Sequence, residues 1–524
     1  MRKFYKLLSL AIIMLILSQE GFSQPIIEWQ KNYGGSYIEC NSYVIPTSNN
    51  GYLIAASSNS NDIDVSGNYG GFDFWVLQTD ATGTLVWQKS YGGSLNEGVH
   101  RAIQTSDGGI VVVGYAESSD GNLTGNNGLK DMWILKINAD NSVAWQKNFG
   151  GSADDEATDI IEAADGSFIV IGNTSSTDGD VLQNKGFNDY WILNIDTAGT
   201  VIWQKTFGGS SDDIASSVVQ TDDGGFIIAG SSFSTDGDIE NHFYTNNYSD
   251  YFIIKTDDHG NKEWVKNYGG NATDNLTQIL KTGDGGYMLC GFSDSDNGDV
   301  TGNHGNMDTW VIKISSTGGI QWQKSVGGSA DDMAFSITQR TDGDYVLCGN
   351  TASDDGMVSG NYGVKDIWVV RLNASGPVVW QKCLGGSMLD DSYSMQLLDD
   401  ENCVISGYSG SSDDDVTSNH GDLDLWLLKL SNLSALENFT FSGEEFLSVY
   451  PNPVSSETVT LKINGNTKAS YTAEMNDVTG RKMFTQIIEG NIPKSIDISM
   501  LSKGIYFISI DGETIKSTEK IIIQ

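Results

Sequence analysis

The sequence predicts an all-β fold, a seven-bladed β-propeller, from three observations: a long internal repeat, turn residues at fixed places within it, and the absence of a helical hydrophobic period. A Trp-x-Lys motif occurs with successive spacings of 58, 58, 58, 61, 58 and 58 residues, at Trp29, Trp87, Trp145, Trp203, Trp264, Trp322 and Trp380. An Asp-x-Trp motif follows the same period, with Phe252 in place of tryptophan in the fourth copy. The chain therefore consists largely of seven equivalent units.

Each unit contains four short predicted strands. In the copy after Gly209 these are residues 215–221, 226–230, 251–256 and 263–268. Tight-turn sequences rich in Asp and Gly, at 222–225 and 257–260, join the first pair and the last pair, and a long polar loop lies between. Four-stranded antiparallel sheets arranged around an axis form a propeller. An immunoglobulin-like sandwich would need about 100 residues per unit.

The phase of the repeat predicts how the ring closes. The first copy supplies only a fourth strand, residues 27–33, and the last copy ends after its third strand, residues 425–430. The N-terminal strand therefore completes the last blade, and closure removes the open sheet edges that invite association. We expect a propeller over residues 24–430, and a monomer.

Composition limits the partners of this chain. Its 524 residues carry 68 acidic and 30 basic side chains, a formal net charge of −38. Such a charge argues against nucleic acid, whose phosphates need a surplus of Lys and Arg, and against anionic membrane surfaces. Five cysteines are too few, and odd in number, for a disulfide framework.

The N-terminus has the features of a signal peptide, which we place at residues 1–23. A basic start with Arg2, Lys3 and Lys6 precedes an apolar run over residues 7–17, and small residues follow. The apolar run is shorter than the roughly 20 residues that span a bilayer, and no later segment is long enough, so we expect no transmembrane segment.

The tail differs in composition from the repeats: a polar linker covers residues 431–446, and period-two strands begin at 447. Three motifs occur in order: Pro451-Asn452-Pro453 after Val449-Tyr450, Gly480 within 477–482, and Gly504 with Tyr506 within 501–507, with Lys520 near the end. Residues 447–524 thus resemble the type A sorting domain of the type IX secretion system of Bacteroidetes-type bacteria. The resemblance implies a small β-sandwich, the type IX machinery as a partner, and release of the cargo or its attachment to surface lipopolysaccharide.

Two series of carboxylates recur in all seven repeats and are candidates for a ligand-binding acidic face. One follows each Gly-Gly-Ser, or Gly-Gly-Asn at 269–271, by three residues: Glu39, Glu97, Asp155, Asp213, Asp274, Asp332 and Asp390. The other opens the Asp-x-Trp motif: Asp73, Asp131, Asp189, Asp250, Asp308, Asp366 and Asp424. In a four-stranded blade the crossover and the loop between the second and third strands lie at one end. Both series should therefore ring that end.

Two interpretations of these acids stay open. In the structural one, carboxylates accept backbone N–H bonds in Asx-type turns and pair with the Trp-x-Lys lysines, which we then expect to be buried between blades. In the other, clustered oxygens bind Ca²⁺. The candidate calcium ligands lie in the long loops: Asp178, Asp180, Asp236, Asp238, Asp296 and Asp299. No other cofactor is indicated.

The repeats place similar loops around a ring, and no blade carries a unique catalytic cluster. This favours a non-catalytic binding or adhesion scaffold at the cell surface or in the medium, with a glycan or protein as ligand. The alternative is a propeller glycoside hydrolase or polysaccharide lyase that uses two of the ringed carboxylates, which would lie about 5 to 5.5 Å apart in a retaining glycosidase.

Overall fold

The computed structural model describes residues 24–523 except 48–49, 240–247, 435–446, 451–453, 455–457, 464–469, 478–480, 490–492 and 512–515. The predicted signal peptide and most of the predicted linker lie outside the described residues. The chain divides into two compact units, Met1–Phe439 and Thr440–Gln524. The described residues form strands and turns, with no helix.

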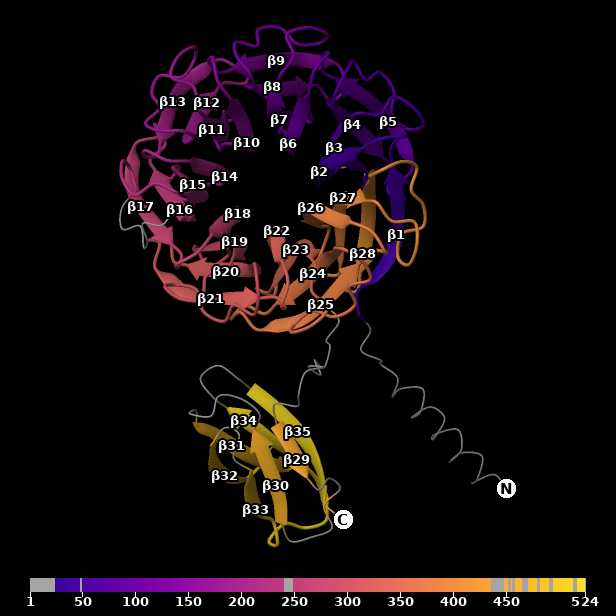
Figure 1. Ribbon diagram of the computed structural model, residues 1–524, viewed down its shortest axis with the longest axis vertical. Coiled ribbons are helices and arrows are strands. Elements are labelled where there is room, and N and C mark those ends of the chain that lie inside the picture. Colours follow the sequence, from indigo (N-terminus) through magenta and orange to yellow (C-terminus); the bar gives the residue numbers. More distant parts are fainter. Residues whose placement is uncertain are drawn as a thin grey trace, which may run out of the picture. The chain divides into compact units, whose positions relative to one another are not determined.

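The first unit is a ring of seven four-stranded antiparallel sheets (Figure 1). Blades 1 to 3, each taken from its innermost strand outward, are β2 (Glu39–Pro46), β3 (Tyr52–Ser58), β4 (Asp73–Thr79), β5 (Leu85–Tyr91); β6 (Glu97–Gln104), β7 (Ile110–Ala116), β8 (Asp131–Ile137), β9 (Val143–Phe149); and β10 (Asp155–Glu162), β11 (Phe168–Thr174), β12 (Asp189–Ile195), β13 (Val201–Phe207). Blades 4 to 6 are β14 (Asp213–Gln220), β15 (Phe226–Ser232), β16 (Asp250–Thr256), β17 (Lys262–Tyr268); β18 (Asp274–Lys281), β19 (Tyr287–Ser293), β20 (Asp308–Ile314), β21 (Ile320–Val326); and β22 (Asp332–Gln339), β23 (Tyr345–Thr351), β24 (Asp366–Leu372), β25 (Val378–Leu384). The predicted seven-bladed propeller is confirmed.

Blade 7 joins the two ends of the ring. Its strands are β26 (Asp390–Leu397), β27 (Asn402–Ser409), β28 (Asp424–Ser431) and, outermost, β1 (Ile26–Tyr33). β1 pairs antiparallel with β28, with Tyr33 opposite Leu425 and Ile26 opposite Ser431. The N-terminal strand thus completes the last blade, as the phase of the repeat predicts.

The tryptophans of the Asp-x-Trp motif form the deepest part of each blade. Six are at most 2% exposed, and each indole N–H donates to a glutamine on the outermost strand of its own sheet; for Trp133 and Gln146 the distance is 3.1 Å. In blade 4 both partners change together. Phe252 replaces the tryptophan and Val265 replaces the glutamine, and both are buried in one apolar cluster. Removing donor and acceptor together leaves no unsatisfied polar group in the core.

The lysines of the Trp-x-Lys motif are not buried, so that prediction is wrong. Three are exposed and four are half-buried: Lys31, Lys89 and Lys266, then Lys147, Lys205, Lys324 and Lys382. Within the described residues, none forms an ion pair. The Lys147 side chain packs over Gly199 in the next blade's outer turn, where an added Cβ would lie 3.0 Å from Lys147 Cγ. These lysines do lie between blades, but on the outermost strand, where the ammonium group reaches water.

A second series of basic residues, on the third strand, is the buried one. Lys136, Lys255 and Lys313 are 3–5% exposed, and Arg371 is 6% exposed. Each forms an ion pair with an aspartate of the tight turn between the first two strands of its own blade, for example Lys136 Nζ with Asp107 Oδ1 at 2.8 Å. The third strand is covered by the fourth, so a charge at this position needs a partner inside the protein.

The second unit contains two sheets around one apolar core, as a small β-sandwich requires. The sheets are β29 (Leu447–Tyr450), β30 (Thr458–Ile463) and β33 (Lys494–Asp497), and β32 (Lys482–Glu489), β31 (Ser470–Asp477), β34 (Gly504–Asp511) and β35 (Lys516–Ile523). Gly504 opens β34, Tyr506 is buried with its hydroxyl donating to Ser502 O at 2.8 Å, and Lys520 is paired with Phe507 in the ladder. Pro451, Asn452, Pro453 and Gly480 lie outside the described residues.

Candidate functional site

The two carboxylate series meet at the junctions between blades. The Asp-x-Trp aspartate opens the third strand of one blade, and the acid after Gly-Gly-Ser opens the first strand of the next. The pairs are Asp73 with Glu97, Asp131 with Asp155, Asp189 with Asp213, Asp250 with Asp274, Asp308 with Asp332, Asp366 with Asp390, and Asp424 with Glu39. We call each pair a junction pair. A Cβ added to Gly150 would lie 2.4 Å from Asp131 Oδ1 and 2.8 Å from Asp155 Oδ2, so the pair occupies the space that only glycine leaves open.

The junction pairs lie inside the protein. All fourteen carboxylates are 0–1% exposed. The predicted convergence at one end of the ring is therefore found, but a solvent-facing acidic ring is not. Gly-Gly-Ser and the long loop close over the carboxylates, and a ligand on the surface cannot touch them.

Backbone N–H groups donate to one oxygen of both acids in the junction pair of Asp131 and Asp155. Asp131 Oδ2 accepts from the Asn127 N–H at 2.7 Å, and Asp155 Oδ2 accepts from the Gly151 N–H at 2.8 Å. The Ser176 hydroxyl also donates to Asp155 Oδ2, at 2.7 Å. These are the short-range carboxylate-to-backbone contacts of the structural interpretation.

Burial, and the neighbouring carboxylate after it, raise the pKa of several junction acids. The pKa of Asp73 is raised to about 7, first by burial and then by the charge of Glu97. The pKa values of Asp131 and Asp189 are raised to about 6 by the same two causes. Two neighbouring buried carboxylates each disfavour the ionised form of the other, and a positive charge beside them would relieve this repulsion.

The loop aspartates predicted as calcium ligands bind the backbone of the preceding crossover. Asp178 Oδ1 accepts from the Ser152 N–H at 2.7 Å, and Asp180 Oδ2 accepts from the Gly150 N–H at 3.3 Å. Asp236 and Asp238 repeat both contacts one blade later. Asp238 also pairs with Lys262 at 2.9 Å. These carboxylates therefore hold the Gly-Gly-Ser turn, and calcium binding by them stays a prediction.

The fifth blade departs from this pattern in one residue. Asn297 occupies the position of Asp178, Asp296 precedes it and is exposed, and the Asp299 N–H donates to Gly269 O at 2.9 Å. The predicted ligand Asp299 is thus equivalent to Asp180 and Asp238, whereas Asp296 is not equivalent to Asp178 and Asp236.

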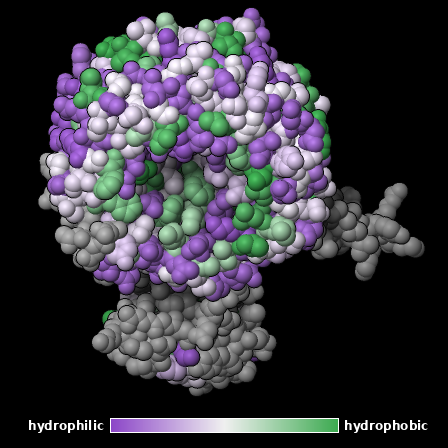
Figure 2. All heavy atoms as spheres, turned by 45° about the horizontal axis from the view of Figure 1, so that its top comes forward, coloured by the Kyte–Doolittle hydropathy of each residue, from purple (hydrophilic) through white to green (hydrophobic). Residues whose placement is uncertain are grey.

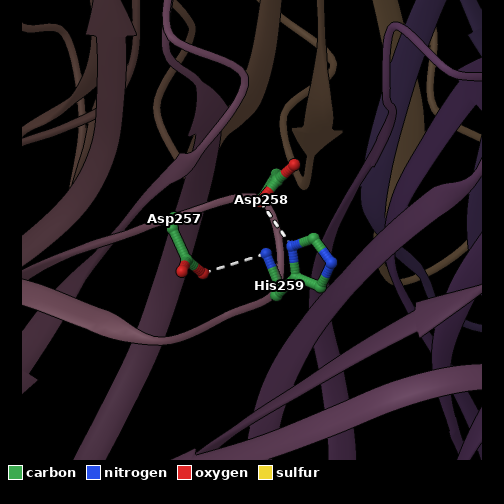
Figure 3. Close-up of side chains that lie close together, drawn as sticks. All are labelled: Asp257, Asp258 and His259. Atoms are coloured by element: carbon green, nitrogen blue, oxygen red, sulfur yellow. Dashed lines mark hydrogen bonds and ion pairs between the residues drawn. The ribbon is translucent and has the colours of Figure 1, made fainter.

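A third acidic group lies in the turn between β16 and β17. Asp257, Asp258 and His259 have ligand atoms within 4.8 Å of one another (Figure 3). Asp257 Oδ1 accepts from the His259 N–H at 2.9 Å, and His259 Nδ1 contacts Asp258 Oδ1 at 2.5 Å. Each group already has a partner in its own turn, and the two contacting side chains are exposed. The arrangement is that of an Asx turn.

The two inner strands of blades 5 to 7 carry an aromatic feature that the sequence analysis does not predict. Figure 2 shows the propeller hollowed at its centre, with apolar side chains on part of the wall. Four aromatic residues from blades 5 to 7 follow one another, with ring centroids 6.5, 6.0 and 5.8 Å apart: Phe292, Phe335, Tyr393 and Tyr408. We call this set the aromatic arc. Phe292, Phe335 and Tyr393 are half-buried, so each keeps part of a ring accessible.

The aromatic arc breaks the repeat. The positions equivalent to Phe335 and Tyr393 hold Thr158 in blade 3 and Ser216 in blade 4. Departures from the repeat at these positions were the available signal in the sequence.

Polar groups accompany the aromatic arc. Asp391 is 7% exposed, accepts from Asn350 Nδ2 at 2.6 Å and lies 3.4 Å from the Tyr408 hydroxyl. Burial raises the pKa of Asp391. In blades 2 and 3, Lys130 pairs with Glu156 at 2.7 Å and lies over the Tyr115 ring at 4.2 Å.

Comparisons with known proteins concern both units. Residues 448–524 match the model of a family described as the secretion system C-terminal sorting domain. The regulatory protein FlaEY of Caulobacter vibrioides is 25% identical over 213 residues, which cover 38% of this chain and 22% of that protein, so this chain spans about a fifth of its relative. Among the described residues, none belongs to a helix with the length and apolarity needed to cross a bilayer.

Two solved structures align with the propeller at low identity. A protein of unknown function from Dyadobacter fermentans is 11% identical, with a TM-score of 0.41 over 78% of this chain and 99% of that chain. An α-L-arabinofuranosidase from Fusarium graminearum is 10% identical, with a TM-score of 0.36 over 79% of this chain and 99% of that chain. The blades and the matched tail together identify a β-propeller that is exported by the type IX secretion system to the cell surface or the medium.

Proposed function

We propose that this exported propeller is a non-catalytic binding module whose ligand is a glycan held on the aromatic arc. The observation that carries the proposal is the run of Phe292, Phe335, Tyr393 and Tyr408 across three neighbouring blades, with the first three rings left partly accessible. Spacings of about 6 Å suit successive stacking contacts along one ligand. Binding sites typically combine aromatic walls with a few placed polar groups.

The polar groups and the charge of the chain favour the class of ligand. Sugar rings present apolar faces that stack on aromatic side chains, and hydroxyl groups that bond to acceptors such as Asp391. With a net charge of −38, the chain repels anionic polymers over long range. A neutral or cationic glycan fits both features.

The test is a glycan array with the mature secreted protein, followed by affinity measurements on Phe335→Ala and Tyr393→Ala. Each variant should weaken binding about tenfold, since an aromatic contact is worth about 0.5–1.5 kcal/mol beyond its area burial. Thr158→Ala and Ser216→Ala, at the equivalent repeat positions, should leave affinity unchanged. Arc variants that bind like the unmodified protein would refute the proposal.

Product analysis decides between binding and catalysis. The ringed carboxylates are too deeply buried to reach a substrate, so a hydrolase or lyase would have to use other acids, and Asp391 is the carboxylate that contacts the arc. New reducing or unsaturated ends from a bound glycan would establish the enzymatic alternative. Binding without such products supports the module.

A further inference from the structure

The junction pairs leave a regular set of oxygen atoms without partners. In six of the seven pairs, Oδ1 of the Asp-x-Trp aspartate is buried and accepts no hydrogen bond: Asp73, Asp131, Asp189, Asp308, Asp366 and Asp424. The side chains that bear these atoms are 0% exposed. A buried polar atom without a partner costs about 1–3 kcal/mol, and more when it is charged. The same unsatisfied oxygen recurs in six junctions, so an irregularity of packing at one site does not explain it.

No cationic side chain fills this deficit within the described part of the chain. No Lys or Arg there forms an ion pair with any of the fourteen junction carboxylates. His304 and His420 do contact Asp308 and Asp424, but at Oδ2, which already accepts a backbone N–H. Oδ1 instead approaches the second carboxylate of its pair, an arrangement that repels unless a positive charge joins it.

Small oxygen-bearing side chains share the sheet face of the Asp-x-Trp aspartates. Asn148 is opposite Trp133 in the ladder, and Asp131 lies two residues before Trp133, so Asp131 and Asn148 share one face of the sheet. The position of Asn148 holds an amide or hydroxyl in six junctions: Asn32, Ser90, Asn148, Thr206, Asn267 and Ser325. Among these, Asn32 and Ser325 also have buried polar atoms without a hydrogen-bond partner. The seventh junction has Cys383.

We propose that each blade junction binds one hard cation, with Ca²⁺ as the fitting ion, between the two carboxylates of its junction pair. Carboxylate, amide and hydroxyl oxygens are the ligands that Ca²⁺ takes in proteins. The unpartnered Oδ1 of the Asp-x-Trp aspartate and an oxygen of the second acid would bind the ion, while Oδ2 of the aspartate stays on its backbone N–H group. A thiol is a soft ligand, so the junction with Cys383, Asp366 and Asp390 is the weakest site.

These sites are distinct from the loop aspartates and from the aromatic arc. The acids would then join neighbouring blades, because one ion would bind both the third strand of a blade and the first strand of the next. The role does not depend on what ligand the arc binds.

The first experiment is a terbium titration of the full secreted chain, stripped with a chelator and dialysed. Each junction pair lies beside a buried aromatic, two residues away in the Asp-x-Trp motif, so Tb³⁺ bound there should be sensitised by tryptophan excitation. We expect sensitised emission that Ca²⁺ displaces, and close to seven equivalents of Ca²⁺ per chain after equilibrium dialysis. Absence of both signals in the unmodified protein would overturn the proposal and leave a proton shared within each pair.

Variants locate the ion. Asp131→Asn should remove one equivalent of Ca²⁺, and the matched control Asp140→Asn, in the exposed turn between β8 and β9, should remove none. The double variant Asp178→Asn, Asp180→Asn tests the loop instead. Loss of an equivalent in the loop variant, with full binding in Asp131→Asn, would place calcium in the loops and refute the junction site. If Asp131→Asn does not fold, the terbium titration of the unmodified chain still decides the question.

Discussion

The buried lysines of the third strand predict an unequal response to mutation of their ion pairs. Lys136 is 3% exposed and its ammonium group contacts Asp107 Oδ1 at 2.8 Å and the Thr105 hydroxyl at 2.5 Å. Its partner differs, because the Asp107 side chain is 62% exposed. Removing the aspartate leaves an unpaired positive charge in the interior, whereas removing the lysine leaves a carboxylate that water solvates.

The magnitudes follow from that difference. Breaking a fully buried pair costs about 3–5 kcal/mol when one charge is left behind. Since water reaches the aspartate side of this pair, we expect about 2 kcal/mol for Asp107→Asn and at most about 1 kcal/mol for Lys136→Met. The double variant should recover most of the loss, because no buried charge remains. Lys147→Met, on the solvent-reaching outer strand, should stay within about 0.5 kcal/mol of the unmodified protein.

Urea denaturation of the four variants, followed by tryptophan fluorescence, measures these free energies of unfolding, and the double-mutant cycle isolates the coupling. Two results would refute the reasoning. One is a larger loss for Lys136→Met than for Asp107→Asn, and the other is a loss for Lys147→Met that equals the loss for Asp107→Asn. Either would mean that burial does not determine which charge the fold needs.

Three further predictions concern the pH dependence of this ion pair, the core of blade 4 and the sorting domain. The pKa of Asp107 is lowered to about 2, first by its hydrogen bond from Lys136, so its ionised form stabilises the fold above the unfolded-state pKa of about 3.9. The loss of stability caused by Asp107→Asn should therefore be constant near neutrality and vanish as pH falls from about 4 to 2. Urea denaturation at a series of pH values measures this loss. In blade 4, Phe252→Trp alone should destabilise by about 1–3 kcal/mol because the indole N–H finds no acceptor, and adding Val265→Gln should restore stability in the same assay. Deleting residues 447–524 should leave a folded propeller in the periplasm, and its appearance in the medium or on the surface would contradict the role of the sorting domain.

The fold was predictable because its determinants are local and repeated. Residues 215–221 were expected as a strand and β14 spans Asp213–Gln220; residues 226–230 were expected and β15 spans Phe226–Ser232. Period-two alternation and Asp-Gly turns indicate such strands directly. The same positions recur in seven copies, so each copy checks the strand boundaries of the others.

Depth within the ring was not predictable in the same way. The alternation of side chains tells which face of a strand a residue occupies. It does not tell that Lys136 lies on the third strand, which the fourth strand covers, while Lys147 lies on the outermost strand. The repeat likewise predicts that the junction acids lie at one end of the ring. Only the packing of the crossover against the long loop shows that they are buried. The aromatic arc requires blades 5, 6 and 7 to be placed side by side, and each repeat alone contains only one or two of its rings.

The closing of blade 7 by β1 has a consequence for the order of events during export. The residues that complete the ring, Ile26–Tyr33, are synthesised before every other strand of the ring, while their partner Asp424–Ser431 comes almost four hundred residues later. Until the partner arrives, β1 has no sheet to join, and the growing arc of blades ends in an open edge. Pairing across such a separation is slow, and open edges aggregate. The sorting domain comes after β28 in the sequence, so it is synthesised only after all the strands that close the ring.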